Sequence, residues 1–170
     1  EGGSAFGTDL SIFSHVIELV REKTKKPIIP KLAPNVSDIG AFAQAAEKAG
    51  ADALAIMNSF PAMGIDIKTR KPVLANGSGG LSGPAIKPIA IKLVHDAAQK
   101  TNLPIIGMGG IFEPEDAVEF FIAGASAVAV GTANFIDPST AIRVINGIET
   151  YLIDQGLNDI KQLVGTVNYG

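Results

Sequence analysis

The chain has 170 residues, of which 46% are hydrophobic and 18% charged, a balance that supports one hydrophobic core in a single domain. A formal net charge of −3 gives no broad basic surface for nucleic acid or for an anionic membrane. No apolar run approaches the ~20 residues that span a bilayer, and no export pattern begins the chain, so we expect a cytoplasmic protein. The lack of cysteine excludes disulfides, thiolate metal sites and a cysteine nucleophile within the chain.

Helical and extended patterns alternate along the sequence. Asp9 is placed to cap the first helix and Ser37 the second, which Gly50 ends in the left-handed region. Pro114 fits the first turn of a later helix that Gly124 ends. The predicted order is a helix after Asp9, a strand over 27–32, a helix after Ser37, a strand over 53–57, a helix around 90–97, a strand over 104–107, a helix over 114–123, a strand over 127–130, and a last helix from Asp137-Pro138.

Two units of this series resemble each other. Pro-Ile-Ile occurs at 27–29 and again at 104–106, and Ala-Gly-Ala leads from helix to strand at 49–51 and at 123–125. This is the pattern of a repeated βαβ unit. Apolar strands joined by helices favour a helix-covered parallel sheet, either doubly wound or part of a (β/α)₈ barrel. Four strands cannot close such a barrel, so we predict an α/β fold that is half of a (β/α)₈ TIM barrel, with residues 1–170 forming one domain.

Glycines follow two neighbouring predicted strands. Gly109 and Gly110 end the run IIGMGGI, and Gly131 with Thr132 follows AVAV. Backbone without Cβ atoms lets N–H groups approach an anion closely, and adjacent loops of (β/α)₈ barrels often hold a phosphate jointly. Tight turns with no ligand are the alternative, so the two pairs together favour phosphate binding over simple turns.

Polar residues stand at the ends of the other two predicted strands. Lys31 interrupts an apolar run, and Asn58 with Ser59 ends another. Each has a structural alternative. Lys31 could simply extend its charged end to solvent, and Asn58 with Ser59 could make ordinary turn hydrogen bonds. Successive strand ends are where barrel enzymes build their sites, so we interpret these residues and the glycines as one candidate site. His15 and His95 fall within helices and are interpreted as structural or solvated, and no metal-ligand spacing is found.

The connection over 61–83 is too long for an ordinary loop between a strand and a helix. Residues 65–67 and 72–74 flank a turn-like basic stretch and predict a small hairpin. The glycine-rich stretch 77–83 predicts a mobile lid.

Several segments resemble one known family. KLAPNVSDI, MNS, IDIKTRKPVLANGSGGLSGPAIKPIA, IIGMGGI and GASAVAVGTANF are similar to dihydroorotate dehydrogenases, most closely the class 1B enzymes of bacterial pyrimidine synthesis. The resemblance implies the C-terminal half, strands five to eight, of an FMN-binding barrel that oxidises dihydroorotate to orotate. It also implies a homodimer joined to a partner subunit, which carries FAD and a [2Fe–2S] cluster and passes electrons to NAD.

The resemblance assigns a role to each candidate residue. Lys31 would lie beside the N1–O2 edge of the flavin, where a fixed cation stabilises the reduced ring. Met57 would contact the flavin through its backbone, and Gly83 would lie near it. Asn58 and Ser59 would hydrogen-bond the pyrimidine. The phosphate would be held by Gly109, Gly110, Gly131 and Thr132.

The sequence also departs from the family pattern. The family's catalytic base is a cysteine just upstream of the pair that is Gly2-Gly3 here, so we expect the base to lie upstream of Glu1 and this chain alone to be inactive. Pro61 is a second departure, because the family usually has another residue type at this position, and a proline there affects the path of the predicted lid. Three interpretations follow: part of a dihydroorotate dehydrogenase, a barrel like that of dihydropyrimidine dehydrogenase, which IKTRKPVLAN fits less well, or a non-catalytic half-barrel that binds phosphate or another protein.

Overall fold

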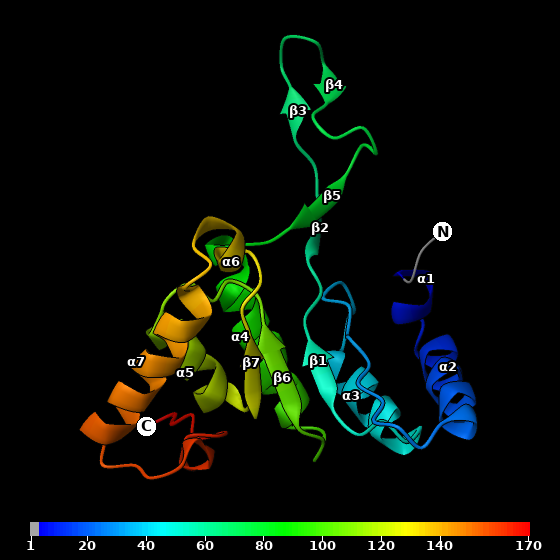
Figure 1. The fold of residues 1–170 in the computed structure, drawn as a ribbon. Helices are drawn as coiled ribbons and strands as arrows, with labels where there is room; N and C mark the ends of the chain where they lie inside the picture. Colours follow the sequence, from blue (N-terminus) through cyan, green and yellow to red (C-terminus); the bar gives the residue numbers. More distant parts are fainter. Residues whose placement is uncertain (1–3) are drawn as a thin grey trace.

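A parallel sheet of three strands forms the centre of the fold (Figure 1). A computed structural model describes residues 4–170, so Gly2 and Gly3 lie outside the described residues. The strands are β1 (Leu54–Ile56), β6 (Ile105–Met108) and β7 (Ala127–Ala129). Their order across the sheet is the same as their order in the sequence, with β6 in the middle. Their parallel pairing brings the three carboxyl ends to one edge of the sheet. Three of the four predicted strands are thus confirmed.

The predicted strand over 27–32 is wrong as a strand. This segment runs beside β1 but forms only one isolated parallel bridge, between Lys31 and Ala55. Leu32 N donates to Ala55 O at 2.9 Å, and Ala55 N donates to Pro30 O at 3.0 Å. Pro27 and Pro30 have no N–H group to donate, so a regular ladder cannot form at this edge.

The long helices begin and end close to where the sequence predicts. Asp9 caps α2, accepting a hydrogen bond from Ile12 N at 2.9 Å, and Gly124 has a φ of 122° at the end of α5. The cap predicted at Ser37 is wrong, because Asp38 accepts from Ala41 N at 3.1 Å instead. The helices are α1 (Ser4–Gly7), α2 (Leu10–Lys23), α3 (Ile39–Lys48), the 3₁₀ helix η1 (Pro84–Ile86), α4 (Lys87–Ala98), α5 (Pro114–Ala123), α6 (Ala133–Ile136), α7 (Thr140–Asp154) and the 3₁₀ helix η2 (Ile160–Gln162).

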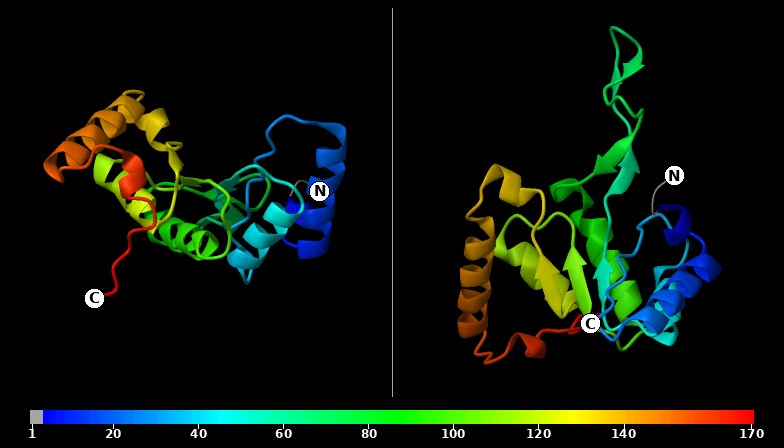
Figure 2. Two further views of the ribbon diagram at one scale, coloured as in Figure 1. Left: turned by 90° about the horizontal axis from the view of Figure 1, so that it is seen from below. Right: turned by 45° about the vertical axis from the view of Figure 1, so that its right-hand side comes forward.

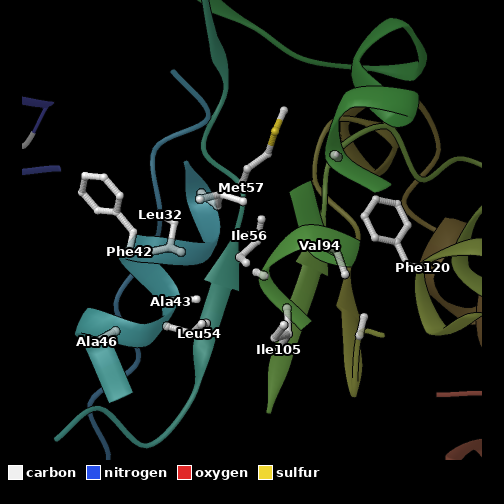
Figure 3. Close-up of a cluster of buried hydrophobic side chains, with 14 of the residues drawn as sticks. Leu32, Phe42, Ala43, Ala46, Leu54, Ile56, Met57, Val94, Ile105 and Phe120 are labelled. Carbon is white, nitrogen blue, oxygen red and sulfur yellow. The ribbon is translucent and has the colours of Figure 1, made fainter. Parts of the chain in front are cut away.

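Helices cover one face of the sheet. Seen from below, α2, α3, α4, α5 and α7 form an arc around one side of the strands (Figure 2). The core lies between this arc and the sheet, where Leu54, Ile56 and Ile105 meet Val94 of α4 and Phe120 of α5 (Figure 3). The opposite face is more open, and Ala127 is exposed on it. This is an α/β fold with a parallel sheet, consistent with part of a TIM barrel.

The segment after β1 extends away from the body as a narrow arm (Figure 1). Its base pairs β2 (Phe60–Ala62) with β5 (Gly79–Leu81), and its tip pairs β3 (Ile65–Asp66) with β4 (Lys71–Pro72), both antiparallel. The hairpin predicted at the tip is confirmed, with shorter strands. Part of the stretch predicted as a glycine lid is instead strand β5. No helix among residues 4–170 is long and apolar enough to cross a membrane.

Candidate functional site

A cavity of about 300 Å³ lies where the carboxyl ends of the three strands meet. Three of its walls are the segments that directly follow β1, β6 and β7, and the fourth contains Lys31. The cavity is lined by Lys31, Met57, Asn58, Ser59, Ser82, Ile86, Met108, Gly109, Gly110, Ile111, Phe112, Ala129, Val130, Gly131 and Thr132.

Eight of the nine predicted cofactor-binding and substrate-binding residues line this cavity. The ninth, Gly83, lies behind the wall, where its carbonyl oxygen accepts a hydrogen bond from Ile86 N at 3.2 Å. A Cβ atom on Gly110 would come within 2.9 Å of that carbonyl oxygen, so Gly83 supports the wall near Gly110. The cavity therefore gathers residues that are far apart in the sequence.

Lys31 is the one charged residue among those lining the cavity. Its side chain is exposed and has no hydrogen-bond or ion-pair partner within the described part of the chain. An unpaired ammonium group in a concave site attracts anions, because low-dielectric walls strengthen its field. The electrostatics of the cavity therefore favour an anionic ligand.

The glycine segments supply backbone donors without side chains in the way. The N–H groups of Gly110, Gly131 and Thr132 donate to no acceptor among residues 4–170. A Cβ atom built on Gly131 has no neighbour within 4 Å, so a side chain there would occupy open space beside the cavity. Gly109 differs, because its φ of 123° and a 3.2 Å approach to Ala90 Cβ exclude most side chains for structural reasons. Free amides, bare backbone and Lys31 fit a phosphate group.

Asn58 and Ser59 make mainly local contacts. The side-chain oxygen of Asn58 accepts from Ser59 N at 3.0 Å, which is the turn geometry given as the structural alternative for this residue. The Ser59 hydroxyl oxygen would lie 2.1 Å from a Cβ atom on Gly80, so Ser59 packs beneath β5 at the base of the arm. The amide group of Asn58 has no acceptor among the described residues and is free to donate to a ligand.

Met57 lines the cavity and also belongs to the core. The residue is 3% exposed (Figure 3). Its amide donates to Met108 O at 3.2 Å, across the ends of β1 and β6.

Sequence reasoning missed several lining residues, of which Ser82 and Phe112 are the most informative. The Thr132 hydroxyl donates to Ser82 Oγ at 2.8 Å and so joins the base of the arm to the loop after β7. Phe112 follows the glycine pair directly and closes one side of the cavity. Phe112 could have been predicted from its position alone, because it directly follows the segment IIGMGGI. No local sequence pattern predicts a role for Ser82, because its hydrogen-bond partner, Thr132, is fifty positions away. No group of three or more potential metal ligands occurs among the described residues.

The fold and the site define an α/β protein with an anion-favouring cavity at the carboxyl edge of a parallel sheet. A family model described as dihydroorotate dehydrogenase matches residues 1–152. The chain belongs to the dihydroorotate dehydrogenase family.

Curated relatives agree with this assignment. The chain is 52% identical over 167 residues to the dihydroorotate dehydrogenase B (NAD(+)) catalytic subunit of Geotalea uraniireducens, covering 98% of this chain and 55% of that protein. It is 52% identical over 168 residues to the subunit of the same name from Caldicellulosiruptor saccharolyticus, covering 99% of this chain and 56% of that protein. The class 1B resemblance is confirmed, and the chain spans about half the length of these relatives.

Proposed function

We propose that this chain is the C-terminal half of an FMN-dependent dihydroorotate dehydrogenase, which oxidises dihydroorotate to orotate in pyrimidine biosynthesis. The single observation that carries the proposal is the cavity whose one charged residue is the unpaired Lys31, facing free amides of two glycine segments. FMN has a phosphate group and a flavin ring that becomes anionic on reduction. One cation and several backbone donors suit both parts.

The arrangement of the fold supports the half-barrel. The strand order follows the chain without the reversal of a doubly wound sheet. The helices at the two ends of the arc expose large apolar side chains, which would be covered by the rest of a closed barrel. These side chains are Leu10, Val16, Leu19 and Val20 on α2, and Ile142, Ile145 and Ile153 on α7.

Seven of the eight predicted residues that line the cavity have a role in this proposal. Gly109, Gly110, Gly131 and Thr132 would surround the phosphate, with the N–H groups of Gly110, Gly131 and Thr132 donating to it. Lys31 would lie at the flavin edge, and Asn58 with Ser59 would orient the pyrimidine. FMN, when bound, supplies the acceptor for the two electrons taken from dihydroorotate. Lys31 stabilises the negative charge that this transfer leaves on the ring.

The proposal extends to partners. An electron-transfer partner subunit is expected, because the similar proteins are named NAD(+) catalytic subunits. The family resemblance adds FAD and a [2Fe–2S] cluster on that partner, and a homodimer of this subunit. No residue of this chain is proposed as the proton-abstracting base, since the sequence contains no cysteine. The catalytic base would come from the part of the relatives that this chain does not match.

FMN binding tests the proposal at its first step. We expect the purified chain to quench FMN fluorescence on titration. Lys31→Ala should weaken binding at least about tenfold, because a hydrogen bond to a charged group contributes about 1.5–3 kcal/mol and about 1.4 kcal/mol is a tenfold change in affinity. Lys161→Ala removes the same charge from an exposed position in η2 and is the matched control. A chain that is folded by circular dichroism and never quenches FMN would contradict the proposal and favour a non-catalytic interaction module.

A further inference from the structure

A partly buried charge network outside the cavity holds the loop that contains Gly109 and Gly110. Lys87, the first residue of α4, places its Nζ atom 2.6 Å from Asp116 Oδ1 and 2.6 Å from Glu119 Oε1. Both carboxylates belong to α5, where a spacing of three residues places them on one face. The side chains of Lys87 and Asp116 are only 24% and 16% exposed.

Asp116 transmits this contact to the loop. Its second oxygen, Oδ2, accepts hydrogen bonds from Phe112 N and from Glu113 N, both at 2.8 Å. Phe112 lines the cavity two residues after Gly110. The carboxylate therefore holds the last peptides of the loop while Lys87 holds the carboxylate.

Lys87 also touches the loop directly. A Cβ atom on Gly110 would come 2.7 Å from Lys87 Cβ and 2.9 Å from Lys87 N. Gly110 has a φ of 82°, a conformation that L side chains rarely adopt. The backbone of Gly110 thus rests on the start of α4, and that start is in turn attached to α5 by the two ion pairs.

The ammonium group of Lys87 faces two carboxylates, whereas that of Lys31 is paired with none among residues 4–170. Lys87 is therefore poorly suited to bind a ligand anion itself, although it lies beside the glycine loop. Building on the proposed function, we propose that Lys87 is a positioning residue that, through Asp116, holds the 109–113 loop in the geometry that binds the FMN phosphate.

The experiment compares Lys87→Met with Lys92→Met. Lys92 lies on the same helix and pairs with Asp96 at 2.6 Å, but its side chain is 69% exposed and it does not touch the loop. We expect Lys87→Met to speed hydrogen exchange in a peptide covering 108–113 and to weaken FMN binding roughly tenfold, the usual size for loss of a group that orients a site from behind. Lys87→Arg is expected to keep the wild-type hydrogen exchange over 108–113 and the wild-type FMN affinity, because arginine retains donors for both carboxylates.

Two measurements separate this inference from the proposed function. Hydrogen exchange in the ligand-free chain tests the positioning role whether or not FMN binds. If the wild-type chain fails to bind FMN, the proposed function fails, whereas wild-type binding with equal affinities in the Lys87→Met and Lys92→Met variants overturns the positioning role. Should Lys87→Met not fold, Asp116→Asn replaces it, since this variant loses the ion pair and keeps an oxygen for the two amides. Unchanged exchange over 108–113 in that variant likewise overturns the inference.

Discussion

Gly147 of α7 lies directly against Pro114, the first residue of α5. A Cβ atom on Gly147 would come 2.2 Å from Pro114 Cγ, much closer than real contacts allow. We predict that Gly147→Ala destabilises the chain by about 1–3 kcal/mol, because the rigid ring cannot move aside and overpacking outweighs the ~1 kcal/mol that alanine gains over glycine in helix propensity. Urea denaturation measures the change. Asn146→Ala, an exposed neighbour, is the control and should be neutral or stabilising.

The first glycine of IIGMGGI has a packing role. A Cβ atom on Gly107 would lie 2.6 Å from Phe120 Cδ1 and 3.1 Å from Ala125 Cβ. We predict that Gly107→Ala lowers the free energy of unfolding by about 1–3 kcal/mol, since β6 could no longer approach α5 closely. An unfolding midpoint equal to that of the wild type would show that Phe120 rotates away without cost.

Gly131 should behave in the opposite way. Its φ is not positive, and a Cβ atom there has no neighbour within 4 Å. We predict that Gly131→Val changes the free energy of unfolding by less than about 0.5 kcal/mol, as for ordinary surface substitutions, but weakens FMN binding at least roughly tenfold by filling the cavity. Ser126→Val, at the far end of β7, is the matched control. Unaltered affinity in Gly131→Val would remove this segment from the site.

The Asp52 carboxylate makes stability depend on pH. Its pKa is lowered first by the hydrogen bond from Ile28 N, at 2.7 Å, and then by Arg21. The unfolded chain therefore binds a proton more readily, so this contribution is complete above the ordinary aspartate pKa of 3.8 and is lost as pH falls through the lower folded value. We predict that Asp52→Asn destabilises the chain at pH 7 and that the gap to wild type narrows in acid.

Urea midpoints at neutral and acidic pH measure that gap. Asp154→Asn is the control, because the Asp154 side chain makes no hydrogen bond or ion pair within the described residues. A difference between wild type and Asp52→Asn that stays constant with pH would contradict the assignment.

Local chemistry made much of the fold predictable. Asp9, Gly50, Pro114 and Gly124 act through their own backbone or side chain within one turn, and their predicted positions are confirmed. The strand predicted over 27–32 failed because hydropathy does not register the missing N–H groups of its prolines. Strand ends were sufficient to predict most cavity residues, since parallel strands bring their carboxyl ends to one edge.

Contacts between distant segments were not predictable. The pairing of β2 with β5 depends on the path of the arm, and Ser82 meets Thr132 only because that path returns to the loop after β7. No sequence pattern singles out Lys87. Its role depends on Asp116, which is 29 positions away. Single-sequence patterns carry no information on such pairs.

The central claim is that this chain supplies the flavin-binding half of a dihydroorotate dehydrogenase. Its most direct test joins the part of the Geotalea uraniireducens relative that this chain does not match to the N-terminus of this chain. The fusion is loaded with FMN, and dihydroorotate is added without oxygen while flavin absorbance is followed. We predict rapid bleaching in the fusion, strong slowing by Lys31→Ala, and no bleaching in this chain alone. A folded, FMN-loaded fusion that stays oxidised would contradict the claim.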